Sequence, residues 1–333
     1  MLLQYILRRT LILIPLLTAV SIISFVIIQL PPGDFLQMEV MRLRSAGTPI
    51  AEEQVNLLKV QYGLDKSLLQ QYWIWIMGIL TRGDFGFSMQ LNRPVGEILA
   101  ERVPLTVLVT LMSAILIWLI AVPIGIYSAT HKYSFFDYFW TFVGFIGLSV
   151  PGFLLALVVM WIAFSRFGIT AIGLVSPEFE NAPWSLAKFI DMLKHIWVPI
   201  LIISFSGTAG LIRTMRSMML DELNKQYVIT ARAKGLSERR LLLKYPARTA
   251  INPVTSTIGW MLPALFAGEV LVSYVLNIPT TGPVLMRSLL NQDMYLAGSI
   301  VFILSCLTVI GTLVSDILLA WLDPRIRFEG NAV

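Results

Sequence analysis

The stretch YVITARAKGLSERRLLLKYPA, residues 227–247, is basic and polar in a chain that is otherwise strongly apolar. Nine Lys and Arg residues lie between positions 213 and 248, against three acidic residues. Ala231 and Ala233 are small and precede Gly235, and small side chains allow a second protein to approach the backbone closely. The pattern leaves two interpretations open: a docking element for another protein, and a solvated amphipathic loop.

The same stretch contains start and stop signals for short helices. Residues 221–223, Asp-Glu-Leu, are expected to open a helix that Gly235 ends in a left-handed cap. Ser237 is expected to cap a second helix with Glu238 in its first turn, and Pro246 limits where that helix ends. The sequence therefore predicts a helix, a glycine turn and another helix.

Two acidic residues lie inside long apolar runs, at Glu269 and Asp316. An acid at the centre of a membrane helix costs roughly 2.5–3.5 kcal/mol, so such residues are candidates for function. Glu269 is expected to face a helix bundle or a pathway, and Ser273 follows one helical turn later on the same face. Asp316 lies only about two turns from the end of its run, where snorkelling or a partner at the helix end can satisfy it. The two acids support one alternative function, a secondary transporter driven by protons or sodium.

The sequence has none of the motifs that carry catalysis. It contains no G-x-x-x-x-G-K-[ST] phosphate loop and no H-E-x-x-H zinc motif. Its two histidines, His131 and His195, are far apart in sequence and indicate residues at span ends, while Cys306 indicates a small buried residue. We therefore expect no catalytic residue, no metal site and no cofactor in this chain.

The composition indicates an integral membrane protein. Of 333 residues, 56% are hydrophobic and 14% are charged, the mean hydropathy is +0.76, and soluble domains carry roughly 25% charge. Six apolar stretches approach or exceed the roughly 20 residues that cross a bilayer. They are residues 10–30, 105–129, 139–164, 196–211, 253–276 and 296–322. The sequence predicts an all-α polytopic membrane protein with six transmembrane helices.

The distribution of Lys and Arg predicts the orientation. The basic residues 213–248 lie between the fourth and fifth spans, and further arginines flank the first and last spans. Because cytoplasmic loops carry an excess of Lys and Arg, both termini and this basic segment are placed in the cytoplasm. Residues 31–104 and 165–195 are then expected outside. The net charge of +5 thus reports topology, and nucleic-acid binding is excluded.

The basic segment resembles the cytoplasmic docking loop of the permease subunits of binding-protein-dependent ABC importers. It is most similar to the peptide/nickel/oligosaccharide group, whose loop reads close to ARAKGL, the sequence at 231–236 here. The general family loop begins Glu-Ala-Ala, and this chain has Ile-Thr-Ala at 229–231, so the spacing to Gly235 is kept and the Glu is absent. Four further stretches are similar to the family in the same order: LQYILRRTLILIP at the start, LPPGD at 30–34, YGLDKSLLQQYWIWIMGILTRGDFGFS at 62–88 and LDPRIRF at 322–328.

The resemblance implies an ABC importer permease fold and an assembly. It divides the chain into a first span (1–30), an extracytoplasmic segment (31–104) and a five-helix core (105–333) with a coupling loop at about 215–250. It implies a second related permease, two P-loop ATPase subunits that bind ATP and Mg, an external solute-binding protein and the inner membrane of a prokaryote. The residues expected to touch the ATPase are Ala231, Ala233, Gly235 and Leu236 for close packing, and Arg232, Lys234, Glu238 and Arg239 for polar contacts.

The substrate is the least determined property. The resemblance implies short peptides or oligosaccharides, and Glu269 and Ser273 are the pathway candidates. Peptide permeases commonly carry a Glu near the position of Ser273, whereas this chain places its acid four residues earlier. The span exit reads Asn-Ile-Pro-Thr-Thr-Gly at 277–282, where those permeases tend towards Pro-Gly-x-Gly.

Overall fold

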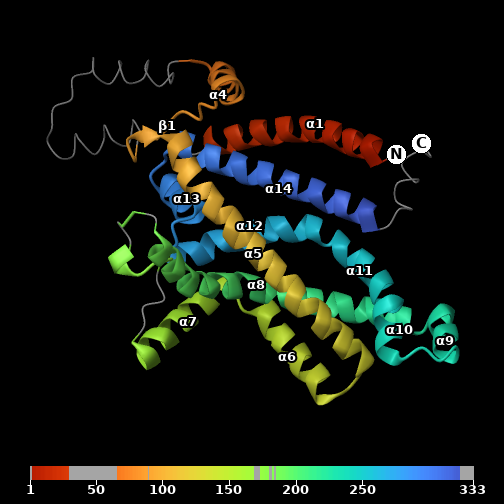
Figure 1. Cartoon of the computed structure of the whole chain (residues 1–333). Coiled ribbons are helices and arrows are strands. Elements are labelled where there is room, and N and C mark those ends of the chain that lie inside the picture. Colours follow the sequence, from red (N-terminus) through yellow and green to blue (C-terminus); the bar gives the residue numbers. More distant parts are fainter. Residues whose placement is uncertain are drawn as a thin grey trace, which may run out of the picture. The chain divides into compact units, whose positions relative to one another are not determined.

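The computed structural model describes residues 2–29, 66–88, 90–168, 173–179, 182–183 and 185–322. Most of them are helical (Figure 1). The elements are α1 (Leu2–Gln29), α4 (Leu68–Arg82), β1 (Phe87–Ser88), β2 (Arg93–Pro94), α5 (Val95–Thr130), α6 (Phe135–Ser149), α7 (Gly152–Phe167), η1 (Pro177–Phe179), α8 (Leu186–Leu223), α9 (Gln226–Ala233), α10 (Glu238–Lys244), α11 (Pro246–Ser256), α12 (Ile258–Val275), α13 (Thr281–Leu290) and α14 (Met294–Leu322). The predicted all-α fold is confirmed, with one short antiparallel hairpin, β1–β2, in the described ranges.

The described residues form two compact units. The first holds the described parts of residues 1–10, 106–279 and 310–333, and the second those of residues 11–105 and 280–309. The motif at 30–34, all but the first residue of the motif at 322–328, and the beginning of the motif at 62–88 lie outside the described residues. The predicted division at residues 30 and 104 stays a prediction, because it concerns the two sides of a bilayer.

Four helices in the described part of the chain are long and apolar enough to cross a bilayer: α1, α5, α8 and α14. Two bent helix pairs bring the number to six if each pair forms one span. Helices α6 and α7 meet at 106°, and Glu238–Ser256 and Met261–Val275 meet at 60°. The described helices thus provide between four and six spans, and the predicted six are reached only if both bent pairs cross the bilayer.

The third predicted span, residues 139–164, is broken and not continuous. Its break lies at Val150 and Pro151, where Val150 has an extended backbone (φ −95°, ψ 121°). A proline disfavours the helical conformation of the residue before it and has no N–H to continue the hydrogen-bond ladder. The apolar run therefore forms two helices.

The helix that contains the fourth predicted span, residues 196–211, is much longer than that span, because α8 has 38 residues. Polar residues interrupt the apolar run, and this makes the span look short in the sequence. In the structure those residues have partners: Asp191 accepts hydrogen bonds from the preceding loop, and Arg216 pairs with a carboxylate of α6. The helix continues past them because their polar groups are satisfied.

Helix α8 lies at the centre of the first unit, packed against α6, α7, α11 and α12. Glycines bring neighbouring helices close to it. A Cβ at Gly125 of α5 would lie 2.6 Å from the Cβ of Met215 and 3.1 Å from the carbonyl oxygen of Ile212. A Cβ at Gly207 of α8 would lie 2.6 Å from Cδ1 of Ile117. The absence of a side chain at Gly125 therefore allows the close approach of α5 and α8, while at Gly207 the neighbouring atom is the movable end of the Ile117 side chain.

The second unit has its own apolar and polar contacts. Trp75 of α4 is buried between Phe25 of α1 and Phe302 of α14, with ring centroids 6.0 and 5.6 Å away. The fully buried Asp293 accepts hydrogen bonds from Ser88 Oγ (2.5 Å) and from the backbone N–H of Gln90 (3.1 Å). Burial raises the pKa of the Asp293 carboxyl, and the Ser88 hydrogen bond opposes that rise. These contacts tie the hairpin to the start of α14.

We expect Gly125→Ala to destabilise the protein, because the new methyl group meets the rigid start of a side chain and a backbone oxygen. Overpacking of this kind costs about 1–3 kcal/mol, and a lower midpoint of thermal unfolding in mild detergent would report it. Gly210→Ala is the matched control, since a Cβ at this glycine of α8 meets nothing within 4 Å. Equal midpoints for the two variants would contradict the importance of the close approach.

Candidate functional site

The predicted coupling loop, at about 215–250, begins inside α8 and forms α9 and α10 beyond it. From here on, the basic segment means residues 226–244, from the start of α9 to the end of α10. Residues 221–223 end α8 and do not open a helix, so that prediction was wrong. The apolar face of α8 continues through Met215 and Met219, both fully buried, and this burial keeps the chain helical to Leu223. Helix α9 then starts after Lys225, and only residues 224 and 225 separate the two helices.

Gly235 forms the predicted left-handed cap between α9 and α10, with φ +79°. Its N–H donates to the carbonyl of Arg232 (3.0 Å), and the N–H of Leu236 donates to the carbonyl of Ala231 (3.4 Å). These two bonds form the Schellman arrangement, which satisfies carbonyls at a helix end. The glycine is needed because other residues adopt this conformation at a cost of roughly 1–2 kcal/mol.

The second short helix begins where predicted but is capped differently. Ser237 is the residue before α10, yet its hydroxyl makes no capping hydrogen bond. Glu238, in the first turn, pairs instead with Arg232 across the glycine turn, with Nε–Oε1 at 2.6 Å and Nη2–Oε2 at 3.2 Å. The Glu238 carboxylate raises the pKa of the Arg232 guanidinium. The turn is therefore closed by backbone bonds and by one exposed ion pair.

Helices α9 and α10 share a small apolar core. Val228, Ala231 and Leu241 are buried, and Leu236 and Tyr245 pack against them. Ala231 thus fills the inside of the segment, and Leu236 is half-buried. The other residues expected to contact a partner are exposed: Arg232, Ala233, Lys234, Gly235, Glu238 and Arg239.

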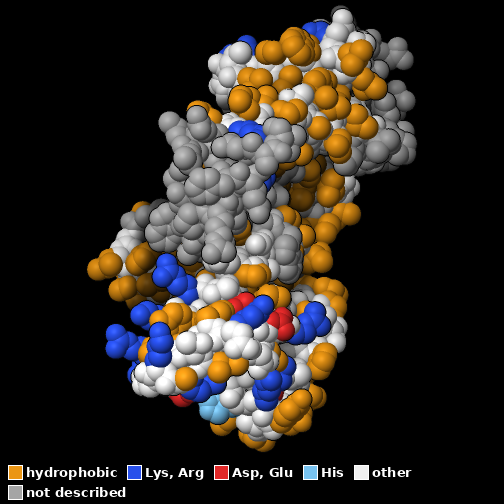
Figure 2. Space-filling view, turned by 90° about the vertical axis from the view of Figure 1, so that its right-hand side faces the viewer, with side chains coloured by type: hydrophobic (Ala, Val, Ile, Leu, Met, Phe, Trp, Pro, Cys, Tyr) orange, Lys and Arg blue, Asp and Glu red, His pale blue; other side chains and the backbone are white. Residues whose placement is uncertain are grey.

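The exposed face of the basic segment keeps an excess of positive charge. Glu238 offsets the charge of Arg232, but Lys234, Arg239 and Arg240 form no ion pair within the described part of the chain. Figure 2 shows Lys and Arg side chains standing out between apolar ones on the face that includes this segment. The arrangement is a rigid, basic, protruding surface with a glycine turn that leaves the backbone accessible.

Glu269 and Ser273 lie together in α12, and both are fully buried. Ser273 Oγ donates to Glu269 Oε1 at 2.5 Å, which confirms that the two residues share one helix face. Helix α12 packs against α7 and α8, so Glu269 faces the helix bundle as predicted. A role of this pair in a pathway stays a prediction.

The remaining polar candidates have structural partners. Asp316 pairs with Arg9 at 3.1 Å, which is the helix-end partner that its position suggested. His131 stacks on Tyr127 with ring centroids 4.3 Å apart, and His195 Nδ1 lies 2.8 Å from the carbonyl oxygen of Asp191. Among the described residues, no group of three or more His, Cys, Asp or Glu is placed to hold a metal ion.

The sequence reasoning missed one polar contact, the ion pair between Asp137 of α6 and Arg216 of α8. Asp137 was not singled out, and Arg216 was counted only among the basic residues that set the orientation. The available signal was an Asp three residues after Ser134, a pattern typical of a helix start. Its partner lies 79 residues away, so spacing alone could not pair them.

We expect Leu241→Ala to loosen the basic segment, because Leu241 is fully buried in its small core. Truncation of a buried leucine costs about 2–5 kcal/mol, which is large for so small a cluster. Hydrogen exchange of the α9 and α10 amides should rise while that of α5 and α8 stays unchanged. Leu243→Ala is the control, since Leu243 lies on the same helix and is exposed; equal exchange in both variants would contradict a shared core.

Comparison with known proteins gives a consistent result along the chain. Residues 121–328 match the family of binding-protein-dependent transport system inner membrane components, and residues 2–110 match the N-terminal region of such membrane components. The oligopeptide transport system permease protein AppB of Bacillus subtilis is 36% identical over 325 residues, covering 97% of this chain and 99% of AppB. The peptidoglycan transport system permease protein YejB of Agrobacterium fabrum is 30% identical over 363 residues (99% of each chain), and the dipeptide transport system permease protein DppB of Escherichia coli K12 is 28% identical over 343 residues (98% of this chain, 99% of DppB). The chain therefore belongs to the family of binding-protein-dependent transport system inner membrane components, and it is a peptide-type ABC importer permease.

Proposed function

We propose that this chain forms half of an ATP-driven pathway that imports short peptides through the inner membrane of a prokaryote. The other half is a second, related permease, and an external solute-binding protein delivers the peptide. ATP and Mg are bound by two partner ATPases, since this chain has no phosphate loop in its sequence. The observation that carries the proposal is the protruding basic segment with its exposed glycine turn, together with its resemblance to an ATPase-docking loop.

Peptides are favoured over oligosaccharides as the substrate. The names of AppB and DppB refer to oligopeptides and dipeptides, and that of YejB refers to peptidoglycan, which contains both sugars and peptides. The exit sequence at 277–282 differs from the pattern expected of peptide permeases. We therefore expect this chain's own residues to determine which peptide lengths and side chains it accepts. Short peptides are the class that fits the relatives.

The basic segment is the docking element for the ATPase, on the cytoplasmic side with both termini. Arg232, Lys234 and Arg239 supply positive charge, and Ala233 and Gly235 allow close packing at the turn. Such a surface fits an acidic-rimmed groove, because opposite potentials bring two surfaces together and fix their orientation. Because α9 and α10 share a core, closure of the ATPases moves the basic segment as one body.

The ion-coupled alternative has little support in this chain. It required two acids in the membrane, and Asp316 is paired with Arg9. Glu269 remains as the buried acid near the proposed pathway, hydrogen-bonded by Ser273. An importer driven by partner ATPases needs no titrating acid of its own, and the family membership agrees with that mechanism.

Gly235→Glu is expected to abolish docking while the protein stays in the membrane. The variant strains a backbone at φ +79° and places a bulky acid on the exposed turn. The measurement is co-purification of P-loop ATPases with tagged protein in mild detergent, followed by uptake of short peptides detected by mass spectrometry in proteoliposomes.

Gly168→Glu is the matched control for that variant. Gly168 also has a left-handed backbone (φ +65°) with no atom within 4 Å of an added Cβ, but it ends α7 in the segment expected outside. It should therefore suffer the same backbone strain and keep its ATPases. Normal uptake by the Gly235 variant, or equal loss of ATPases in both, would count against the docking assignment.

Glu269→Gln is expected to lower peptide uptake severalfold, because it removes the buried carboxyl group while keeping the shape and an acceptor for Ser273. Asp316→Asn should leave uptake nearly unchanged, since its partly exposed ion pair is worth about 0–1 kcal/mol. The same proteoliposome assay measures both variants. Loss of uptake in both, with uptake in the wild type abolished by an ionophore, would favour ion coupling.

A further inference from the structure

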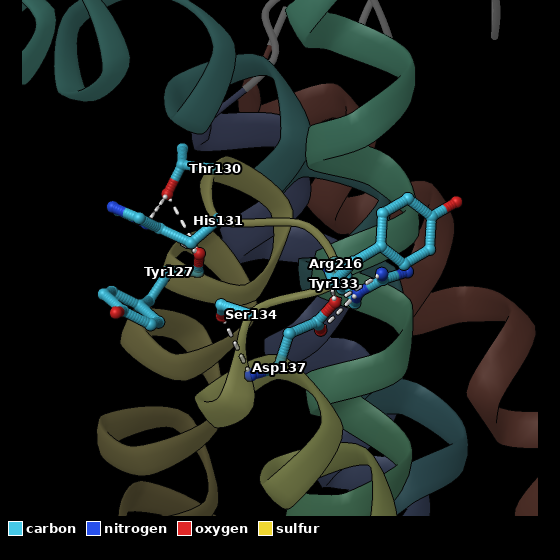
Figure 3. A network of polar contacts seen from close by, with 7 residues as sticks. All are labelled: Tyr127, Thr130, His131, Tyr133, Ser134, Asp137 and Arg216. Atoms are coloured by element: carbon cyan, nitrogen blue, oxygen red, sulfur yellow. Dashed lines mark hydrogen bonds and ion pairs between the residues drawn. The ribbon is translucent and has the colours of Figure 1, made fainter.

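A bidentate ion pair joins two helices of the first unit, α6 and α8 (Figure 3). Arg216 Nε donates to Asp137 Oδ1 and Arg216 Nη2 donates to Asp137 Oδ2, both at 2.8 Å. The Asp137 side chain is 4% exposed and that of Arg216 is 27% exposed. Paired, nearly parallel hydrogen bonds of this kind fix direction as well as distance.

The structure of the α6 start holds Asp137 in position independently of Arg216. The N–H of Asp137 donates to Ser134 Oγ (3.2 Å), and the N–H of Tyr133 donates to Asp137 Oδ2 (3.0 Å). Tyr133 has a left-handed backbone (φ +61°), which orients that N–H toward the carboxylate. The carboxylate also lies in the first turn of α6, where the helix dipole favours a negative charge.

Arg216 lies on a well-packed part of α8. Its neighbours Met215 and Met219 are fully buried, and Gly125 of α5 lies directly against Met215. Arg216 is seven residues from the end of α8 at Leu223, which is about 10 Å at the rise of an α-helix. Beyond residue 225, α9 begins, and the hydroxyl of Tyr227 donates to Glu222, back across this short link.

On its other side, the ion pair leads toward the pathway candidates. Helix α6 continues through the bend at Pro151 into α7, and α7 packs against α12, which carries Glu269 and Ser273. A Cβ at Gly152, the first residue of α7, would lie 3.4 Å from Val272 of α12. The pair thus lies between the basic segment and the helix that carries the buried acid.

We propose that the Asp137–Arg216 pair is a positioning contact for transport, which makes α6 follow α8 when the basic segment is displaced. This inference rests on the proposed function, because the displacement comes from the docked ATPases. The two helices also pack closely against each other, with Gly147 of α6 lying against Ala209 and Phe205 of α8. The hydrophobic effect is non-directional, whereas the bidentate fork adds a contact that fixes the direction of α6 relative to α8 as well as the distance.

The first test measures the α6–α8 distance in the assembled transporter. Spin labels are attached at Phe142→Cys on α6 and Ser217→Cys on α8, both exposed positions, in a Cys306→Ser background. The proposal expects the same distance distribution without nucleotide and with ATP, because the two helices move together. If the label distance changes with ATP while the ion pair is intact, the proposal is overturned.

The second test alters the pair itself. Arg216→Lys keeps the charge and loses the fork, and Asp137→Asn keeps the shape and loses the charge. In both variants, the ATPases should still co-purify and hydrolyse ATP. The amount of peptide imported per ATP should fall at least about fivefold, which is the lower end of typical coupling effects. The distance between the two spin labels should become nucleotide-dependent. Glu101→Gln is the control, because Glu101 also pairs with an arginine, Arg93, but on the exposed surface of the second unit.

The outcomes separate the two proposals. Unchanged import per ATP in both variants, with an unchanged label distance, would overturn the coupling role and leave Asp137–Arg216 a structural pair. A loss of stability with import per ATP preserved in the remaining protein would overturn it as well. If the wild-type chain purifies without ATPases, the proposed function itself fails, and the coupling role fails with it.

Discussion

The first unit depends on the continuity of α8, which runs without a break from Leu186 to Leu223. A helix of 38 residues is about 57 Å long, nearly twice the roughly 30 Å hydrocarbon core of a bilayer. Its ends therefore extend beyond the lipid tails, and polar residues such as Asp191 are accommodated there. Because the helix is unbroken, a force on its last turn acts on its whole length.

Several charged or polar side chains lie within the helices of this apolar chain. The following side chains each have a hydrogen-bond or ion-pair partner, which reduces the free-energy cost of their position. Arg216 has Asp137, Asp316 has Arg9, and Glu269 accepts from Ser273. A buried ion pair often stabilises a protein no more than apolar residues of the same size would. The Asp137–Arg216 pair is therefore better explained by the geometry that it fixes than by stability, and this reasoning favours a positioning role.

The sequence predicted the features that depend on local chemistry. The left-handed turn at Gly235, the helix beginning at Glu238 and the shared face of Glu269 and Ser273 all follow from residue type and spacing, and the structure confirms them. Features that depend on tertiary contacts were missed. The length of α8 depends on partners for its polar residues, and the burial of Ala231 depends on Leu241. Neither partner is visible in a local pattern.

A docking element that transmits motion has to be stiff in itself and stiffly joined to what it moves. Helices α9 and α10 meet the first condition through their core of Val228, Ala231 and Leu241. The second is met by a link of only two residues, 224 and 225, and by the hydrogen bond from Tyr227 to Glu222. With little free chain between them, a displacement of the basic segment becomes a displacement of α8. In the proposed mechanism, the Asp137–Arg216 pair then makes α6 follow α8.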